Sequence, residues 1–248
     1  MPGGLIAAKR ALLGSTGTPY SDKVLGTEAA NLLAYWRLQE ASGTDADNYE
    51  GTAARDGTYT GVTLGQTGIG DGLTCPLFDG ANDYVDIYSI SLRDAFDGAT
   101  GTLAIWGKVS GVGVWSDDTI RRLVNLRVNS DNFVQILKRG SGSDDLRWSY
   151  KAGGTQEDVD LTTTTTDWFH AAITWSVAAD EVKAYFNGSQ TGSTQTGLGT
   201  WVGSIVEDGT NIGALTETPT FVWDGYLAHC AVWTKVLTAA QISNIASL

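Results

Sequence analysis

Short apolar runs separated by turn residues dominate the chain from residue 32 to its end. Within residues 182–188, Val182, Ala184 and Phe186 occupy alternate positions, which lie on one face of an extended strand. Asn187 and Gly188 follow at once, and this dipeptide is typical of a tight hairpin turn. Residues 124–128 and 133–138 flank a turn at 129–131 and predict a second hairpin.

The same pattern predicts further strands at residues 33–38, 84–87, 103–109, 146–151, 168–175 and 226–233. Helix signals are rare in this part of the chain. A short helix is expected near the C-terminus, where Thr238 is a suitable N-cap and Gln241 occupies the capping-box position. Many short strands with little helix predict an all-β fold, a two-sheet antiparallel jelly-roll sandwich that forms one domain over residues 32–248.

Residues 1–31 do not follow the strand pattern and are predicted to form a short N-terminal arm. A solvated tail would have little reason to hold apolar residues such as Leu5, Ile6, Leu12, Leu13 and Val24. The arm is therefore expected to pack, either back on its own sandwich or across to a neighbouring subunit of a homo-oligomer or virion lattice. We favour the second arrangement, in which deletion of residues 2–28 abolishes assembly and leaves the sandwich largely stable.

Charge and composition exclude several classes of function. A net charge of −12 argues against a nucleic-acid partner, and it suits calcium or a neutral glycan as well as plain solubility. No apolar run approaches the roughly 18 residues of a membrane helix, so no membrane insertion is expected. The N-terminal apolar run is too short for a signal peptide. Cys75 and Cys230 form no CxxC pair, which excludes a zinc knuckle and leaves open whether they form a disulfide.

Seven short motifs then follow one another along the chain. They are residues 33–38 (LAYWRL) with 42–43 (SG), 56–59 (DGTY), 78–80 (FDG) with 83–85 (DYV), 168–172 (WFHAA), 185–188 (YFNG), 212–213 (IG) with 224–225 (DG), and 237–242 (LTAAQI). In this order the chain resembles the laminin G-like, concanavalin A-like lectin domains, in the branch common in bacterial and phage proteins. The resemblance covers about residues 32–247 and implies the jelly-roll fold. One departure is Ala228, where the family often has an Asp in the last strand, so a site that needs this Asp is in doubt.

The fold includes glucanases, but the residues do not indicate catalysis. Glycoside hydrolysis needs two carboxyl groups about 5–9 Å apart. No two of the seven glutamates are closer than ten residues, and no Glu-x-Asp-x-Glu arrangement occurs. His170 and His229 lie within predicted strands, away from any nucleophile motif. We expect no enzyme activity, although Asp pairs brought together by loops stay an open alternative.

Two kinds of binding site remain as candidates. Calcium prefers carboxylate, amide and carbonyl oxygens, and Asp47, Asp79, Asn82 and Asp83 lie in loops that this fold can bring together. The alternative is that these side chains bond only the backbone of their own turns. A glycan site needs exposed aromatic faces, and the candidates near loops or strand ends are Trp115, Trp148, Trp201 and Trp223. Packing in the core is the alternative for each of them.

These observations predict a non-catalytic carbohydrate-binding or adhesion module, part of a phage virion or another surface assembly. Its expected partners are a glycan or cell-surface polysaccharide and, through residues 1–30, other virion or surface proteins. A purely structural attachment protein that binds no glycan is the alternative, and a glycoside hydrolase is less favoured. The expected location is the virion or an extracellular surface.

Overall fold

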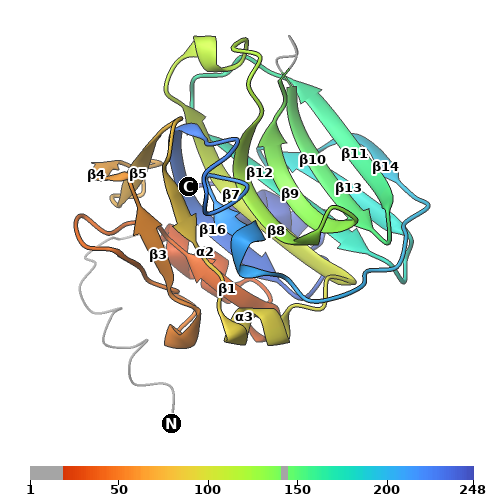
Figure 1. Ribbon diagram of the computed structural model, residues 1–248. Coiled ribbons are helices and arrows are strands. Elements are labelled where there is room, and N and C mark those ends of the chain that lie inside the picture. The colour runs from red at the N-terminus through yellow and green to blue at the C-terminus, as the bar shows by residue number, and fades with distance from the viewer. Residues whose placement is uncertain (1–18, 141–144) are drawn as a thin grey trace.

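The computed structural model describes residues 19–140 and 145–248, which form two antiparallel sheets packed face to face (Figure 1). Sheet A has the strand order β14-β13-β12-β7-β16-β5-β4, and β1 pairs with another part of β16. Its strands are β1 (Leu32–Trp36), β4 (Thr63–Thr67), β5 (Thr74–Asp79), β7 (Thr100–Val109), β12 (Phe169–Ser176), β13 (Glu181–Phe186), β14 (Ser189–Gln195) and β16 (Asp224–Trp233).

Sheet B has the order β11-β10-β9-β8-β15-β6-β3-β2, and Figure 1 shows β8, β9 and β10 in front of the strands of sheet A. Its strands are β2 (Asp45–Ala46), β3 (Gly57–Thr60), β6 (Tyr84–Asp86), β8 (Arg121–Asn129), β9 (Asn132–Lys138), β10 (Asp145–Ala152), β11 (Thr155–Thr162) and β15 (Thr210–Ile212). The predicted all-β sandwich with two antiparallel sheets is confirmed.

The predicted turns occur where the sequence places them. Asn187 and Gly188 both have positive φ, at 48° and 81°, as the tight turn between β13 and β14 requires. The helices are α2 (Tyr20–Gly26), α3 (Ile90–Ala95) and α4 (Ala239–Ile245), and the 3-10 turns are η1 (Ala29–Asn31), η2 (Ala53–Arg55), η3 (Val112–Val114) and η4 (Glu207–Gly209). Thr238 caps α4 in a capping box with Gln241, as predicted.

Alternation along the strands produces two apolar cores. Leu103 and Ile105 of β7 point between the sheets, into the main core, while Ala104 and Trp106 point to the outer face of sheet A. Helices α2 and α4 cover that outer face, so sheet A is buried on both sides. On the outer face of sheet B, the polar residues Asn125 and Asn211 are fully buried, and Arg122 and Phe133 are half-buried.

Helix α2 corrects the predicted boundary of the N-terminal arm. Tyr20 and Val24 are 5% and 2% exposed and belong to the second core, together with Ile242 and Ile245 of α4. Residues 20–31 therefore pack on their own domain and do not cross to a neighbour. The apolar positions of residues 1–18 lie outside the described residues.

Two further observations concern the cysteines and the helices. Cys75 and Cys230 are buried free thiols, so no disulfide joins them. None of the helices in the described part of the chain is long and apolar enough to cross a membrane.

Candidate functional site

The outer face of sheet B carries a row of polar side chains that are paired in register from strand to strand. In sheet order the row runs Thr58, Asp86, Asn211, Asn125, Gln135, Ser149 and Asp158. Directly opposite residues in a sheet point to the same face, so these side chains form one line across β3, β6, β15, β8, β9, β10 and β11. Asn211 and Asn125 are fully buried and Gln135 is 6% exposed. The η4 segment lies beside the middle of the row, since Asn125 donates to the carbonyl of Gly209 at 2.7 Å.

A hollow of about 350 Å³ lies over the β8–β11 part of this face. Alternate residues of β9 form its floor: Phe133, Gln135 and Leu137. The strand β10 contributes Ser149, and Gln156 of β11 lies on its far side. The floor thus combines a half-buried aromatic ring and an apolar side chain with amide and hydroxyl groups.

Acidic partners already hold one arginine at the edge of the hollow. The Arg147 guanidinium donates to Asp160 at 2.6 and 2.7 Å and to Asp158 at 2.6 Å. These carboxylates raise the pKa of Arg147, and they fix its planar group against β11. Ser149 also donates to Asp158, at 2.6 Å, so this side of the hollow is rigid.

Arg122 lines the same hollow with its charge uncompensated. Its guanidinium carbon lies 5.5 Å from the centre of the Phe221 ring, and its buried Nε has no hydrogen-bond partner. Burial, with a contribution from Arg127, lowers the pKa of Arg122 to about 10, so it stays a cation at neutral pH. A half-buried cation that faces a hollow is suited to an anionic group of a ligand.

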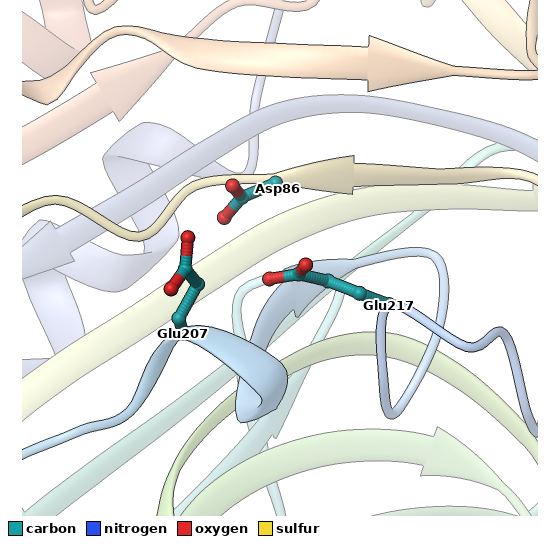
Figure 2. A group of neighbouring side chains, drawn as sticks. All are labelled: Asp86, Glu207 and Glu217. Carbon is teal, nitrogen blue, oxygen red and sulfur yellow. The ribbon is translucent and has the colours of Figure 1, made fainter.

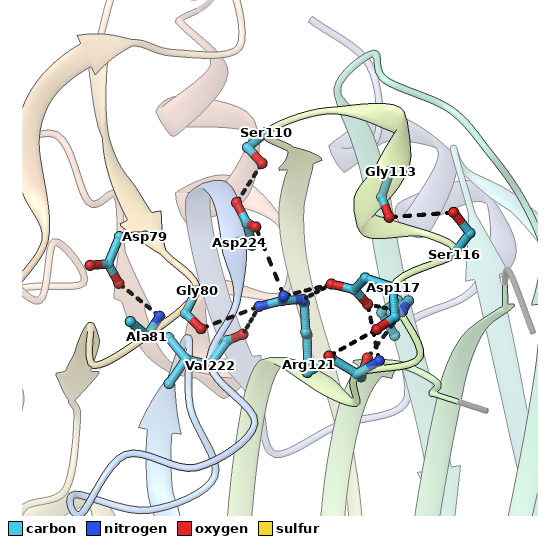
Figure 3. Close-up of polar contacts among 12 residues, drawn as sticks. Asp79, Gly80, Ala81, Ser110, Gly113, Ser116, Asp117, Arg121, Val222 and Asp224 are labelled. Atoms are coloured by element: carbon cyan, nitrogen blue, oxygen red, sulfur yellow. Dashed lines mark hydrogen bonds and ion pairs between the residues drawn. The ribbon is translucent and has the colours of Figure 1, made fainter. Parts of the chain in front are cut away.

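A buried ion network holds the loop before β8 in place (Figure 3). Asp117 accepts from Arg121 at 2.5 and 2.9 Å and from Lys138 at 2.6 Å. Burial opposes ionisation of Asp117, but these hydrogen bonds outweigh it and hold the pKa of the carboxyl below its usual range. Arg121 also donates to the carbonyl of Val222 at 2.9 Å, which ties the loop before β16 to β8. The network therefore positions the segment that carries Arg122.

The turn between β5 and β6 holds three of the four residues predicted to bind calcium, Asp79, Asn82 and Asp83. Asp79 accepts from the backbone of Ala81 at 2.8 Å (Figure 3) and from that of Asn82 at 3.3 Å, and Asp83 accepts from the backbone of Asp79 at 2.9 Å. The carboxylates of Asp79 and Asp83 thus accept hydrogen bonds from the backbone of their own turn. Asp47 lies after β2 and forms no cluster with them among the described residues. A calcium site that uses some of Asp47, Asp79, Asn82 and Asp83 stays a prediction.

Three other carboxylates do come together, at Asp86, Glu207 and Glu217 (Figure 2). Asp86 belongs to β6, Glu207 to η4, and Glu217 to the loop between β15 and β16. Their oxygens lie within 4.8 Å of one another. Sequence reasoning missed this group because its members are far apart in the chain, and only the position of Asp86 within a strand motif gave any signal.

The expectation that four tryptophans present exposed faces is wrong as well. Trp115, Trp148, Trp201 and Trp223 are 1%, 0%, 8% and 0% exposed, and all four belong to the main core. Trp201 shows the physical reason, because its loop folds inward and the ring packs at 5.8 Å from Phe96, edge to face. Among the residues that line the hollow, the aromatic one is Phe133.

Comparisons with known proteins agree with this architecture. The model of a family described as the concanavalin A-like lectin/glucanases superfamily matches residues 79–243. A search of curated proteins finds no match.

Several solved structures share the fold at low sequence identity. Domain 4 of AbnA, an extracellular arabinanase from Geobacillus stearothermophilus, in complex with arabinotriose, is 14% identical with a TM-score of 0.60, over 88% of this chain and 98% of that domain. The binding domain of botulinum neurotoxin serotype D is 12% identical with a TM-score of 0.59, over 87% of this chain and 51% of that one. Trypanosoma rangeli sialidase is 14% identical with a TM-score of 0.63, over 88% of this chain and only 32% of that one. At these identities the likeness concerns the fold.

Proposed function

The chain belongs to the concanavalin A-like lectin/glucanases superfamily, and from this premise we propose that it is a non-catalytic carbohydrate-binding module whose ligand occupies the hollow on sheet B. The observation that carries the proposal is the floor of that hollow. Phe133 and Leu137 offer an apolar surface, and Gln135, Ser149 and Gln156 offer polar groups around it.

This combination matches the chemistry of a sugar. A sugar ring has an apolar face that packs on an aromatic side chain, and its hydroxyls both donate and accept hydrogen bonds. Gln135 and Gln156 can do the same through their amides, and the volume falls at the lower end of the range for ligand sites. The solved structure of AbnA domain 4 with arabinotriose supports the proposal, because it shows a similar fold in complex with an oligosaccharide.

Arg122 narrows the class of glycan. Its cationic group has no carboxylate partner in the hollow, whereas Arg147 beside it is neutralised by Asp158 and Asp160. A sugar that bears a carboxylate would pair with Arg122 through charge-assisted hydrogen bonds. We therefore propose that acidic saccharides bind more tightly than their neutral counterparts.

A glycan array with the full chain, followed by titration calorimetry on the best ligand, tests this function. Phe133→Ala and Arg122→Gln should each weaken binding about 10–100-fold, from loss of ring packing or of a charge-assisted bond. Arg93→Gln on helix α3 removes the same charge away from the hollow, and it should leave the dissociation constant unchanged. Equal binding by all variants, at unchanged melting temperature, would place the ligand elsewhere.

One observation favours a second candidate, a glycoside hydrolase. The oxygens of Asp86, Glu207 and Glu217 approach as closely as the carboxyl pair of a retaining enzyme, and burial raises the pKa of Glu217 as a general acid needs. The ligands from the array should be incubated with the protein and analysed for cleavage. Turnover that Glu217→Gln abolishes would establish the hydrolase and end the non-catalytic proposal.

The biological setting stays with the sequence prediction of a phage virion or another surface assembly. If the array and calorimetry find no glycan at all, the structural attachment role becomes the better description of the protein.

A further inference from the structure

The carboxylates of Asp86, Glu207 and Glu217 meet where three separate chain segments converge on the outer face of sheet B (Figure 2). Their carboxylate oxygens lie within 4.8 Å of one another, and no ion pair joins any of the three to a Lys, Arg or His among the described residues. Acidic groups held this close, without a base, need a proton or a cation to offset their repulsion.

A second, independent observation comes from Asn211. Its side chain is fully buried, and neither its Oδ1 nor its Nδ2 has a hydrogen-bond partner. Asn211 pairs directly with Asp86 across β15 and β6, so the two side chains point to the same face, with Cβ atoms about 4.5–5.5 Å apart. A buried amide with both polar atoms unsatisfied is rare in native proteins.

Glu217 contributes a further unsatisfied atom. Its Oε1 is buried and accepts no hydrogen bond, although its backbone N–H is held by Asp208 at 3.1 Å. The loop that carries Glu217 is therefore fixed, while its carboxylate faces Asp86 and Glu207 with an unused oxygen. Three carboxylates and one amide oxygen from a fixed framework form the donor set that hard divalent cations prefer.

We propose that Asp86, Glu207, Glu217 and the Oδ1 of Asn211 bind a divalent cation of the Ca²⁺ type. The ion offsets the repulsion of the three carboxylates and satisfies the amide oxygen. It also ties the segment before β15, which carries Glu207, and the segment after it, which carries Glu217, to strand β6.

The site adjoins the hollow without forming part of it. Gln135 lines the hollow and belongs to the same polar row as Asp86, three strands away, which is roughly 14 Å at the spacing of a sheet. Asn125 lies between them and donates to the carbonyl of Gly209 at 2.7 Å, next to Glu207. A bound cation therefore orders the loop that adjoins the sugar-binding surface.

Melting curves of the full chain, stripped with chelator and titrated with Ca²⁺ at constant ionic strength, test the site. A saturable rise of roughly 5–10 °C is expected when Ca²⁺ reaches 100 times its dissociation constant. Asp86→Asn and Glu217→Gln should abolish the rise. Without the ion these variants should melt at or above the wild-type temperature, because one of the repelling charges is gone. If the two carboxylates had a purely structural role, the substitutions would instead lower the melting temperature.

Controls keep the test decisive. Asp94→Asn on α3 removes an exposed carboxylate elsewhere, and it should keep the full response to Ca²⁺. Glu207 is exposed, so Glu207→Gln should fold even if a buried variant does not, and calorimetry on it should show weakened one-to-one binding. The proposal would be overturned if Ca²⁺ up to millimolar concentration left the melting temperature of the wild type unchanged. It would also be overturned if Ca²⁺ raised the melting temperatures of Glu207→Gln and Glu217→Gln as much as that of the wild type.

Discussion

Replacing Tyr20 with Phe should destabilise the whole domain, because the Tyr20 hydroxyl joins helix α2 to both sheet A and helix α4. The hydroxyl donates to the carbonyl of Ile245 at 2.7 Å and accepts from the indole N–H of Trp106 at 2.7 Å. Its ring is 5% exposed and lies 4.7 Å from the ring of His229, edge to face. Phe keeps these ring contacts and removes only the oxygen.

The size of the effect follows from the two partners that lose their bond. Each buried polar group left without a partner costs about 1–3 kcal/mol, so the loss for the two groups together should be about 2–5 kcal/mol. For the Ile245 carbonyl we use the lower half of this energy range, because α4 ends close to the C-terminus of the chain. For a domain of this size, the melting temperature should fall by roughly 5–15 °C.

Urea unfolding and thermal melts, followed by circular dichroism, measure this loss. Tyr84→Phe is a matched control, since the Tyr84 ring is half-buried and its hydroxyl bonds no other described residue, and its stability should change by less than about 0.5 kcal/mol. Deletion of residues 2–28 should cost more than Tyr20→Phe, because it also removes the buried Val24. A loss below about 1 kcal/mol for Tyr20→Phe, with a deletion that melts like the full chain, would refute the assignment of α2 to the core.

Two further substitutions have defined outcomes. Gly98→Ala should unfold the protein or lower its free energy of unfolding by more than about 3 kcal/mol, because φ is +70° and a Cβ there would lie 2.1 Å from the Trp201 ring. The control is Gly26→Ala, whose Cβ would meet no atom within 4 Å, and it should leave the free energy of unfolding nearly unchanged in the same melts. Burial lowers the pKa of His170 to about 3, so the folded state keeps it neutral while the unfolded state takes up a proton below about pH 6.5. The stability that this histidine contributes is therefore lost as the pH falls from 6.5 toward 3. The free energy of unfolding of the wild type, relative to that of His170→Phe, should drop by about 2 kcal/mol between pH 7 and 5. An unchanged difference between the two proteins would contradict a neutral, buried His170.

Most strands could be predicted from the sequence because local signals specify them. The alternation of Val182, Ala184 and Phe186 and the Asn187-Gly188 turn lie within seven residues, and they determine a hairpin without help from the rest of the chain. The order of strands in each sheet is different, since β15 pairs with β8 across 84–88 residues of sequence and with β6 across 125–127. No local pattern contains that register.

The binding face could not be predicted for the same reason. Asn125, Gln135 and Ser149 look like ordinary polar positions in separate strands, and only their register makes them neighbours. The tryptophans led to the opposite error, because buried core residues were predicted to be exposed. Trp201 follows a Gly-rich stretch and looks like a loop residue, but Gly98 has no side chain and leaves the slot into which its ring folds.

Sheet A explains why both proposed sites lie on sheet B. Helices α2 and α4 cover the outer face of sheet A, so apolar residues such as Trp106 and Trp233 are buried there against other apolar groups. The outer face of sheet B carries polar residues at its buried positions, such as Asn125, Asn211 and Gln135. Asn125 and Asn211 each keep an unsatisfied amide atom there, which folding alone would disfavour, because a buried polar group without a partner costs stability. The row of polar side chains across sheet B therefore lowers the stability of the free protein. We interpret it as a surface that binds partners, with the proposed cation at one end and the proposed sugar at the other.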